Sequence, residues 1–243
     1  MRLDDVTVEL GGRAVVEAVS ASVESGEAIA IVGRNAAGKT TLLRAMAGLL
    51  RPRRGRVMLG DRPMHSLSPR DRAASVAFVS QRPLVAAAFT VRELVALGRF
   101  ARPRDDARVT AALDRLGLAA SADRPYHELS VGQQQRASLA RAMAQADARS
   151  LVLLDEPFAA SDLGETARSV AVLREHAAAG GAVVAVLHDL SQACALASTV
   201  WILDEGRLVA RGPTREVLDT DRLSRLFGIP FDAGPYGPVA RLH

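Results

Sequence analysis

The residues with the clearest chemical potential form a short loop that contains two glycines. Its members are Gly33, Arg34, Asn35, Ala36, Ala37, Gly38, Lys39, Thr40 and Thr41. In a loop of this spacing, backbone N–H groups point inward at phosphate oxygens, the lysine ammonium reaches the terminal phosphates, and the first threonine hydroxyl is a ligand for Mg²⁺. The loop therefore predicts a site for a nucleoside triphosphate and magnesium.

The lysine of this loop has no counterpart elsewhere in the sequence. Lys39 is the one lysine among 31 basic residues, and all the others are arginine. An ammonium is a compact point charge on a thin stem, whereas a guanidinium is a planar fork. We infer that Lys39 occupies a narrow pocket that an arginine does not fit.

Two carboxylates follow a separate apolar segment. Residues Leu151–Leu154 are expected to form a strand, and Asp155 and Glu156 come directly after it. Ligands of open α/β sheets bind at the carboxyl ends of the strands, so both acids are expected at the edge where the phosphate loop lies. Asp155 is expected to hold Mg²⁺ through a water molecule, and Glu156 to orient or deprotonate the attacking water. A strand that merely ends in solvated acids is the weaker alternative beside such a loop.

Two more polar side chains end apolar strands. His188 follows Ala182–Leu187, and Gln81 follows Val76–Ser80. A lone histidine is more often structural than chemical, but the strand-end position favours contact with a γ-phosphate for His188. The other four histidines have no such position and receive no role.

The order of the elements predicts an α/β fold with a parallel core sheet. Strands are expected at Ala28–Val32, Val76–Ser80, Leu151–Leu154 and Ala182–Leu187, with helical stretches between them. Alternation of short apolar strands and helices is typical of parallel strands joined by crossover helices. The helix after the phosphate loop is expected over Thr41–Leu50.

Helical signals dominate the middle of the chain. Thr90-Val-Arg-Glu93 is a capping-box pattern, Asp105–Leu116 has apolar residues at helical spacing, and a further helix is expected over Gln133–Ala146. We expect a single domain over residues 1–243, with a core of about 1–82 and 146–243 and an inserted helical subdomain of about 83–145. The segment Leu84–Phe89 has about even odds of being ordinary core or of moving the insertion when nucleotide binds.

The carboxyl-terminal part is expected to add small elements to the core. A hairpin is expected around Asp204–Arg207, and two helical turns run on through Phe227. The last dozen residues are rich in Gly and Pro and are expected to be loop.

Composition sets the outer limits. The 243 residues are 49% hydrophobic and 24% charged, which excludes a disordered chain. Cys194 is the one cysteine, so neither a disulfide nor a multi-thiolate metal site within one chain is available. No run reaches the roughly 18 apolar residues of a spanning helix, and the first residues are acidic where a signal peptide is basic. The net charge of +4 permits contact with nucleic acid, but the scattered arginines give no reason to expect it.

Together with Leu129-Ser-Val-Gly-Gln133, these motifs make the chain resemble the ATP-binding subunits of ABC transporters. The resemblance runs from about residue 3 to residue 230 and implies a P-loop NTPase, RecA-like parallel core with an amino-terminal antiparallel β part. It implies that Gly33–Thr41 is the Walker A loop, and that Asp155 and Glu156 are the Walker B pair. The further roles it implies belong to Gln81 (Q-loop, also toward Mg²⁺), Ser130, Val131, Gly132 and Gln133 (signature), Asp162 (D-loop) and His188 (switch histidine).

The family resemblance also implies partners. In the family, ATP is enclosed between two such subunits arranged head to tail, so Ser130 of one copy is expected to cap the γ-phosphate held by the other. A helix N-terminus with small residues is an anion cap, although an N-capping serine without a ligand is locally sufficient. The family implies ATP and Mg²⁺ as cofactors, a homodimer of the subunit, integral membrane permease subunits, and a position on the cytoplasmic face of the cell membrane.

The sequence departs from the common family pattern at four positions. Ala36 replaces a loop glycine, Val131 replaces the first signature glycine, Phe158 replaces a threonine, and Leu10 replaces an adenine-stacking aromatic residue. Ala36 is costly only where the backbone needs a positive φ, and Val131 only where its side chain points at nucleotide.

Weaker similarities concern the transported substrate. The segments 89–99, 186–190 and 212–229 are similar to those of iron-siderophore, haem and cobalamin importers, where a substrate-binding protein acts indirectly with the ATPase. Zinc or manganese importers, an ABC ATPase acting on nucleic acid or ribosomes, and a nucleotide-binding regulatory module without turnover are the alternatives. We expect an importer ATPase, because the chain lacks the coiled-coil, zinc-finger or tandem-domain insertions of the nucleic-acid class and keeps Glu156 and His188.

Overall fold

The computed structural model describes residues 1–81 and 88–241, which fold around a central six-stranded sheet. Residues 82–87, including most of the segment Leu84–Phe89 and the expected boundary at 82/83, lie outside the described residues. In spatial order the sheet is β10-β9-β3-β8-β7-β6. Its strands are β3 (Ala28–Val32), β6 (Val76–Val79), β7 (Leu151–Asp155), β8 (Ala182–Val186), β9 (Thr199–Asp204) and β10 (Arg207–Pro213).

Neighbouring strands from β9 to β6 are parallel, and only β10 pairs in the antiparallel sense. Every residue of β3, β7 and β8 is buried. Because side chains alternate along a strand, Ile29 and Ile31 face one hydrophobic core while Ala28, Ala30 and Val32 face another. Burial on both faces explains why these strands are continuously apolar in the sequence, and it confirms the expected parallel α/β core.

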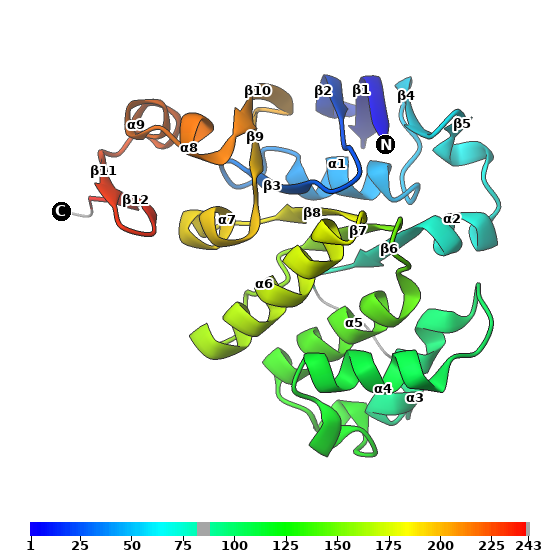
Figure 1. Ribbon diagram of the computed structural model, residues 1–243. Helices are drawn as coiled ribbons and strands as arrows, with labels where there is room; N and C mark the ends of the chain where they lie inside the picture. The colour runs from blue at the N-terminus through cyan, green and yellow to red at the C-terminus, as the bar shows by residue number, and fades with distance from the viewer. Residues whose placement is uncertain (82–87, 242–243) are drawn as a thin grey trace.

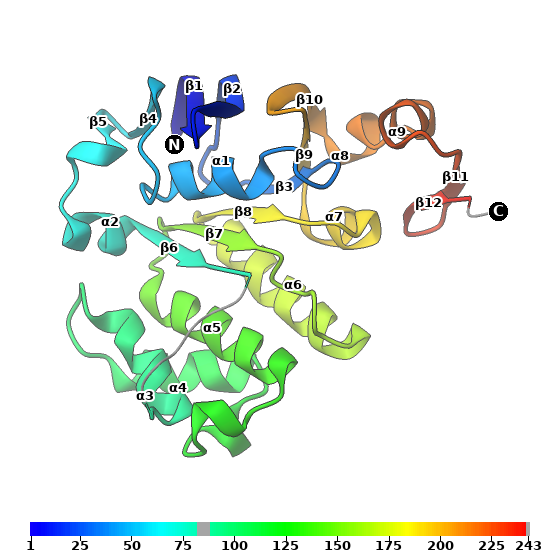
Figure 2. The same ribbon diagram turned by 180° about the vertical axis from the view of Figure 1, so that it is seen from behind.

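A smaller antiparallel sheet lies over one face of the central sheet, with helix α1 (Lys39–Met46) between the two sheets. Its four strands, in the order β2-β1-β4-β5, are β1 (Arg2–Leu10), β2 (Arg13–Ser22), β4 (Arg54–Leu59) and β5 (Arg62–Pro63). Figures 1 and 2 show α1 lying between this sheet and the central sheet. The arrangement confirms the expected amino-terminal antiparallel part.

The other face carries helices. Three of them gather on the far side from α1, as the green ribbons of Figure 1 show: α3 (Val91–Ala96), α4 (Asp106–Arg115) and α5 (Val131–Gln145). The capping box expected at Thr90 is present, because its hydroxyl accepts from the Glu93 N–H and the Glu93 carboxylate accepts from the Thr90 N–H. The remaining helices are α2 (Pro69–Ser75), α6 (Leu163–Ala178), α7 (Leu190–Leu196), α8 (Thr214–Val217) and α9 (Thr220–Phe227), with 3₁₀ turns at Met64–Ser66, Leu97–Arg99, Ala119–Ser121 and Tyr126–Glu128.

Some expected element ends and types were wrong. Helix α1 stops at Met46 rather than at Leu50, because Gly48 follows in the left-handed conformation (φ 70°). The carboxyl-terminal segment is a hairpin of β11 (Phe231–Gly234) and β12 (Gly237–Ala240), not a loop. Pro is tolerated in β12 because the strand belongs to a two-stranded ribbon and has a free edge.

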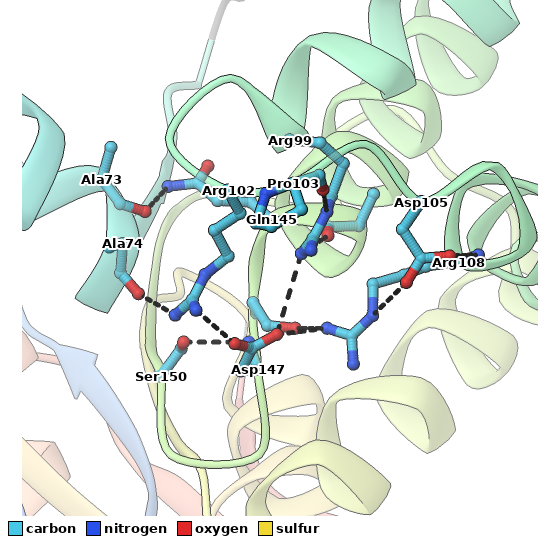
Figure 3. Close-up of polar contacts among 12 residues, drawn as sticks. Ala73, Ala74, Arg99, Arg102, Pro103, Asp105, Arg108, Gln145, Asp147 and Ser150 are labelled. Atoms are coloured by element: carbon cyan, nitrogen blue, oxygen red, sulfur yellow. Dashed lines mark hydrogen bonds and ion pairs between the residues drawn. The ribbon is translucent and has the colours of Figure 1, made fainter.

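A polar cluster fastens the helical region to the core where α5 leads into β7 (Figure 3). Three guanidinium groups converge on the Asp147 carboxylate, from Arg102 (2.5 Å), Arg108 (2.7 Å) and Arg99 (3.7 Å). Arg102 also donates to the carbonyl of Ala74, at the end of α2. One carboxylate therefore holds together three cations that otherwise repel each other.

The end of α5 makes a second tie at the same place. The Gln145 amide donates to the carbonyls of Ala73 (2.8 Å) and Val76 (3.0 Å). Val76 begins β6, the strand that leads to Gln81. The cluster thus links the helical region to an edge strand of the sheet that ends at the candidate site.

Replacing the shared carboxylate tests this cluster. In Asp147→Asn the three arginines lose their common counter-charge, so we expect the free energy of unfolding in urea to fall by about 2 kcal/mol. The control is Asp123→Asn, whose carboxylate is 85% exposed and pairs with Arg92; its effect should stay within about 0.5 kcal/mol. Equal midpoints for both variants would contradict a structural role for the cluster.

Candidate nucleotide site

The phosphate loop connects β3 to α1, and its two glycines are required by close backbone neighbours. Gly33 has φ 147° and Gly38 has φ 93°. A Cβ at Gly33 would collide with the carbonyl oxygen of Leu203, and one at Gly38 with that of Val15. Both positions therefore exclude any other residue, and neighbouring strands set the curvature of the loop.

Lys39 lies folded back into this loop. Its ammonium donates to the carbonyls of Gly33 and Arg34, both at 2.8 Å, and the residue is only 5% exposed. Burial lowers the pKa of Lys39, and the negative charges of Glu156 and Asp155 oppose that shift. A buried ammonium held by two carbonyls can exchange them for phosphate oxygens when an anion enters the loop.

The hydroxyl of Thr40 faces the carboxylate of Asp155, with 2.9 Å between Oγ1 and Oδ1. Burial raises the pKa of Asp155, and the hydrogen bond from Thr40 works in the opposite direction. A hydroxyl beside a buried carboxylate is an all-oxygen donor set of the kind that Mg²⁺ uses together with phosphate and water. Over the described ranges, no group of three or more His, Cys, Asp and Glu side chains is arranged for a metal. The residues present therefore fit a magnesium ion that arrives with its nucleotide.

Glu156 is held between two side chains from neighbouring strand ends. Its Oε2 accepts from the amide of Gln81 at 2.7 Å, and its Oε1 lies 2.7 Å from Nε2 of His188. The backbone is unusual here, because Glu156 has φ 51° while its N–H donates to the carbonyl of Val186. A strained turn that aims a carboxylate at two polar partners is typical of a functional site.

The predicted signature residues begin helix α5. The Ser130 hydroxyl accepts from the Gln133 N–H at 3.2 Å, and the Gln133 amide oxygen accepts from the Ser130 N–H at 3.0 Å. The helix begins at Val131, two residues earlier than expected. Asp162 caps α6 by accepting from the Glu165 N–H at 2.8 Å.

The structure thus divides the predicted residues into two groups. The first group comprises Gln81, Asp155, Glu156 and His188. Glu156 contacts Gln81 and His188, while Asp155 precedes Glu156 in the chain and contacts Thr40 of the phosphate loop. Across the described part of the chain, no hydrogen bond or ion pair joins that first group to the second, which comprises Ser130, Val131, Gly132, Gln133 and Asp162.

The four departures from the family pattern have different consequences. Ala36 has φ 62°, a conformation that a side chain disfavours, so the loop is strained where the family has glycine. Val131 is 70% exposed, so its isopropyl group points away from the protein interior. Phe158 is only 2% exposed and fills the core, and Leu10 lies half-exposed at the end of β1.

The sequence did not predict the backbone contacts that shape and support the phosphate loop. The carbonyls of Val15 and Leu203 shape the phosphate loop, and the Gly206 N–H donates to the Ala37 carbonyl at 3.1 Å. These are backbone contacts between segments distant in the chain. No side-chain pattern could have indicated them.

A loop of this geometry between the parallel strand β3 and helix α1, with two acids at the end of β7 in the same sheet, defines a P-loop NTPase. The sequence profile of the ABC transporter family matches residues 16–159. The chain belongs to the ABC transporter family, and it is an ATP-binding, ATP-hydrolysing subunit of that family.

Curated relatives cover nearly the whole chain. It is 40% identical over 237 residues to the hemin import ATP-binding protein HmuV of Rhodopseudomonas palustris strain BisA53, covering 94% of this chain and 88% of the relative. It is 43% identical over 226 residues to the protein of the same name in Nocardia farcinica, covering 90% and 78%. The solved dimeric ATP-binding cassette MJ0796, in a post-hydrolysis state with ADP and phosphate, is similar with a TM-score of 0.79, 25% identity, and coverage of 88% and 98%.

Within residues 1–81 and 88–241, no helix combines the length and the apolar character needed to cross a bilayer.

The lone lysine provides a direct test of the site. In Lys39→Arg the wider guanidinium does not fit between the two loop carbonyls, so we expect ATP hydrolysis to fall about a hundredfold or more. The thermal midpoint should change little, because the ammonium is held by carbonyls of the loop itself, those of Gly33 and Arg34. Arg53→Lys, at a side chain 73% exposed, is the matched control and should hydrolyse ATP normally. Normal turnover in Lys39→Arg would refute the assignment.

Proposed function

We propose that this protein is the ATPase subunit of an ABC importer for haem, working as a homodimer on a membrane permease. The observation that carries the ATPase part is the position of the Glu156 carboxylate, held by Gln81 and His188 beside the phosphate loop. Support for haem comes from the names of relatives that are 36–43% identical over most of the chain. A binding protein would deliver the haem to the permease.

In this proposal the phosphate loop binds the triphosphate, and Lys39 leaves the Gly33 and Arg34 carbonyls to contact the terminal phosphates. Thr40, Asp155 and Gln81 would hold Mg²⁺, which when bound neutralises charge on the phosphate oxygens. Glu156 orients the attacking water and accepts its proton, and His188 contacts the γ-phosphate. The strained Glu156 backbone keeps the carboxylate aimed between its two partners.

A second copy completes the enclosure. Ser130, Val131, Gly132, Gln133 and Asp162 make no polar contact with the phosphate loop within one described chain. Val131 and Leu163, beside these residues, are 70% and 91% exposed, which is unusual for apolar side chains without a partner. Arranging two copies head to tail would cover both and place the Ser130 end of α5 against the partner's nucleotide.

A groove between the core and the helices supports the permease interaction. It encloses about 520 Å³, and its lining is mainly apolar but includes two arginines; among the lining residues are Leu49, Arg72, Leu97, Phe100 and Arg141. Leu49 and Phe100 are 59% and 66% exposed. We assign this groove to a cytoplasmic helix of the permease with an apolar face and acidic flanks, which would hold the subunit at the inner face of the membrane.

This assignment follows the division into a core of about 1–82 and 146–243 and a helical subdomain of about 83–145. Leu49 belongs to the core and Phe100 to the helical region, so a helix in the groove would contact both parts. Nucleotide binding that turns one part relative to the other would then move the permease.

The catalytic assignment is tested with Glu156→Gln. The amide keeps the shape of the side chain but does not accept the proton, so we expect hydrolysis to fall about a hundredfold to ten-thousandfold. MgATP should convert this variant to a stable dimer in size-exclusion chromatography with light scattering, whereas MgADP should not. Hydrolysis at the normal rate would show that Glu156 is not the base.

The groove is tested with Phe100→Glu. The added carboxylate places charge in an apolar surface and repels the acidic flanks of the proposed helix, so co-purification with the permease and ATP-driven haem uptake into vesicles should both be lost. Val209→Glu, at a residue 55% exposed on β10, is the control and should retain both. Wild-type uptake by Phe100→Glu would show that the groove does not bind the permease. Uptake of another substrate in place of haem would show that the transported substrate is not haem.

A further inference from the structure

The start of α5 packs directly on the segment that carries Asp162. A Cβ built on Gly132 would collide with the carbonyl oxygen of Ala160 and would lie 3.5 Å from Oε2 of Glu165. Gly132 is therefore needed for close approach of two backbones, a reason separate from any contact with nucleotide. The helix tip bearing Ser130 thus rests on residues 160–165.

A buried ion pair joins the same two segments. Arg136, in the second turn of α5, pairs with the carboxylate of Glu165 in the first turn of α6. The Arg136 side chain is 8% exposed and that of Glu165 is 31% exposed. A guanidinium so deeply buried requires its counter-charge, so the pair fixes the distance between the helices.

Glu165 is also bonded to Asp162. Its backbone N–H donates to Asp162 Oδ1 at 2.8 Å while its side chain binds Arg136. Asp162 in turn follows Glu156 by six residues, with Phe158 buried between them. A six-residue step along the chain therefore leads from the catalytic carboxylate to Asp162, and residues 160–165 contact the helix that carries Ser130.

We propose that the Arg136–Glu165 ion pair is a positioning device that makes the Ser130 tip of α5 and the Asp162 tip of α6 one rigid surface for the second subunit. The inference rests on the proposed function, because that surface acts on the nucleotide of the partner. The pair touches no nucleotide itself. Its loss should weaken the closed dimer while leaving nucleotide binding to a single chain intact.

The chain offers a matched control. Arg115 of α4 pairs with Glu175 of α6 at 2.6 Å and also joins the helical region to the core. Its side chains are 43% and 68% exposed, and the pair is more than two helical turns along α6 from Asp162. Because this pair is more exposed than the Arg136 pair, Arg115→Gln shows how much dimerisation changes when an ion pair between the helical region and the core is lost away from the Ser130 and Asp162 tips.

The experiment measures two constants in the Glu156→Gln background. MgATP-dependent dimerisation is followed by analytical ultracentrifugation, and binding of MgADP to the single chain by fluorescence titration. We expect Arg136→Gln to weaken dimerisation about tenfold, with MgADP affinity unchanged, and Arg115→Gln to change neither. Glu165→Gln should behave like Arg136→Gln, and it replaces that variant if circular dichroism shows that Arg136→Gln does not fold.

The possible results distinguish a failure of the positioning role from a failure of the two-subunit site. Equal dimerisation constants for Arg136→Gln and Arg115→Gln, or a loss of MgADP affinity as large as the loss of dimerisation, would overturn the positioning role. A parent Glu156→Gln protein that stays monomeric in MgATP would contradict the two-subunit site, and this inference with it.

Discussion

The register of the parallel strands is the constraint on which the rest of the structure depends. Asp155 pairs with Val186 across β7 and β8, and Val79 pairs with Leu154 across β6 and β7. Shortly after these pairs come Gln81, Glu156 and His188, to which we assign chemical roles. Because both faces of these strands are buried, a slip by one residue would turn each apolar side chain to the wrong core. Packing therefore fixes the register, and the register brings Gln81, Glu156 and His188 within hydrogen-bonding distance.

The loop and the strand ends could be predicted because their signals are local. Gly33 and Gly38 mark a turn, the apolar runs mark buried strands, and the polar residue after each run marks a shared edge of the sheet. The same holds for the capping box at Thr90. The family resemblance added the proposed roles of Ser130 and Asp162, which no local pattern in this chain assigns.

What the sequence could not predict depends on contacts between distant segments. The left-handed backbone of Ala36 follows from the path of the loop rather than from alanine itself. The hairpin Phe231–Ala240 contains Gly and Pro, which also occur in loops, and its strands exist because they pair with each other. The sequence does not distinguish Arg136 from the other arginines, because its burial against Glu165 depends on the placement of α5 and α6.

We propose above all that a single chain holds the terminal phosphates from one side only. The most direct test is the structure of the Glu156→Gln protein with MgATP. We expect the γ-phosphate to lie between Lys39 of one copy and Ser130 of the other, with the Gly33 and Arg34 carbonyls released from the ammonium. A triphosphate bound away from the loop, or held in the loop of a single chain with Ser130 facing solvent, would contradict the account.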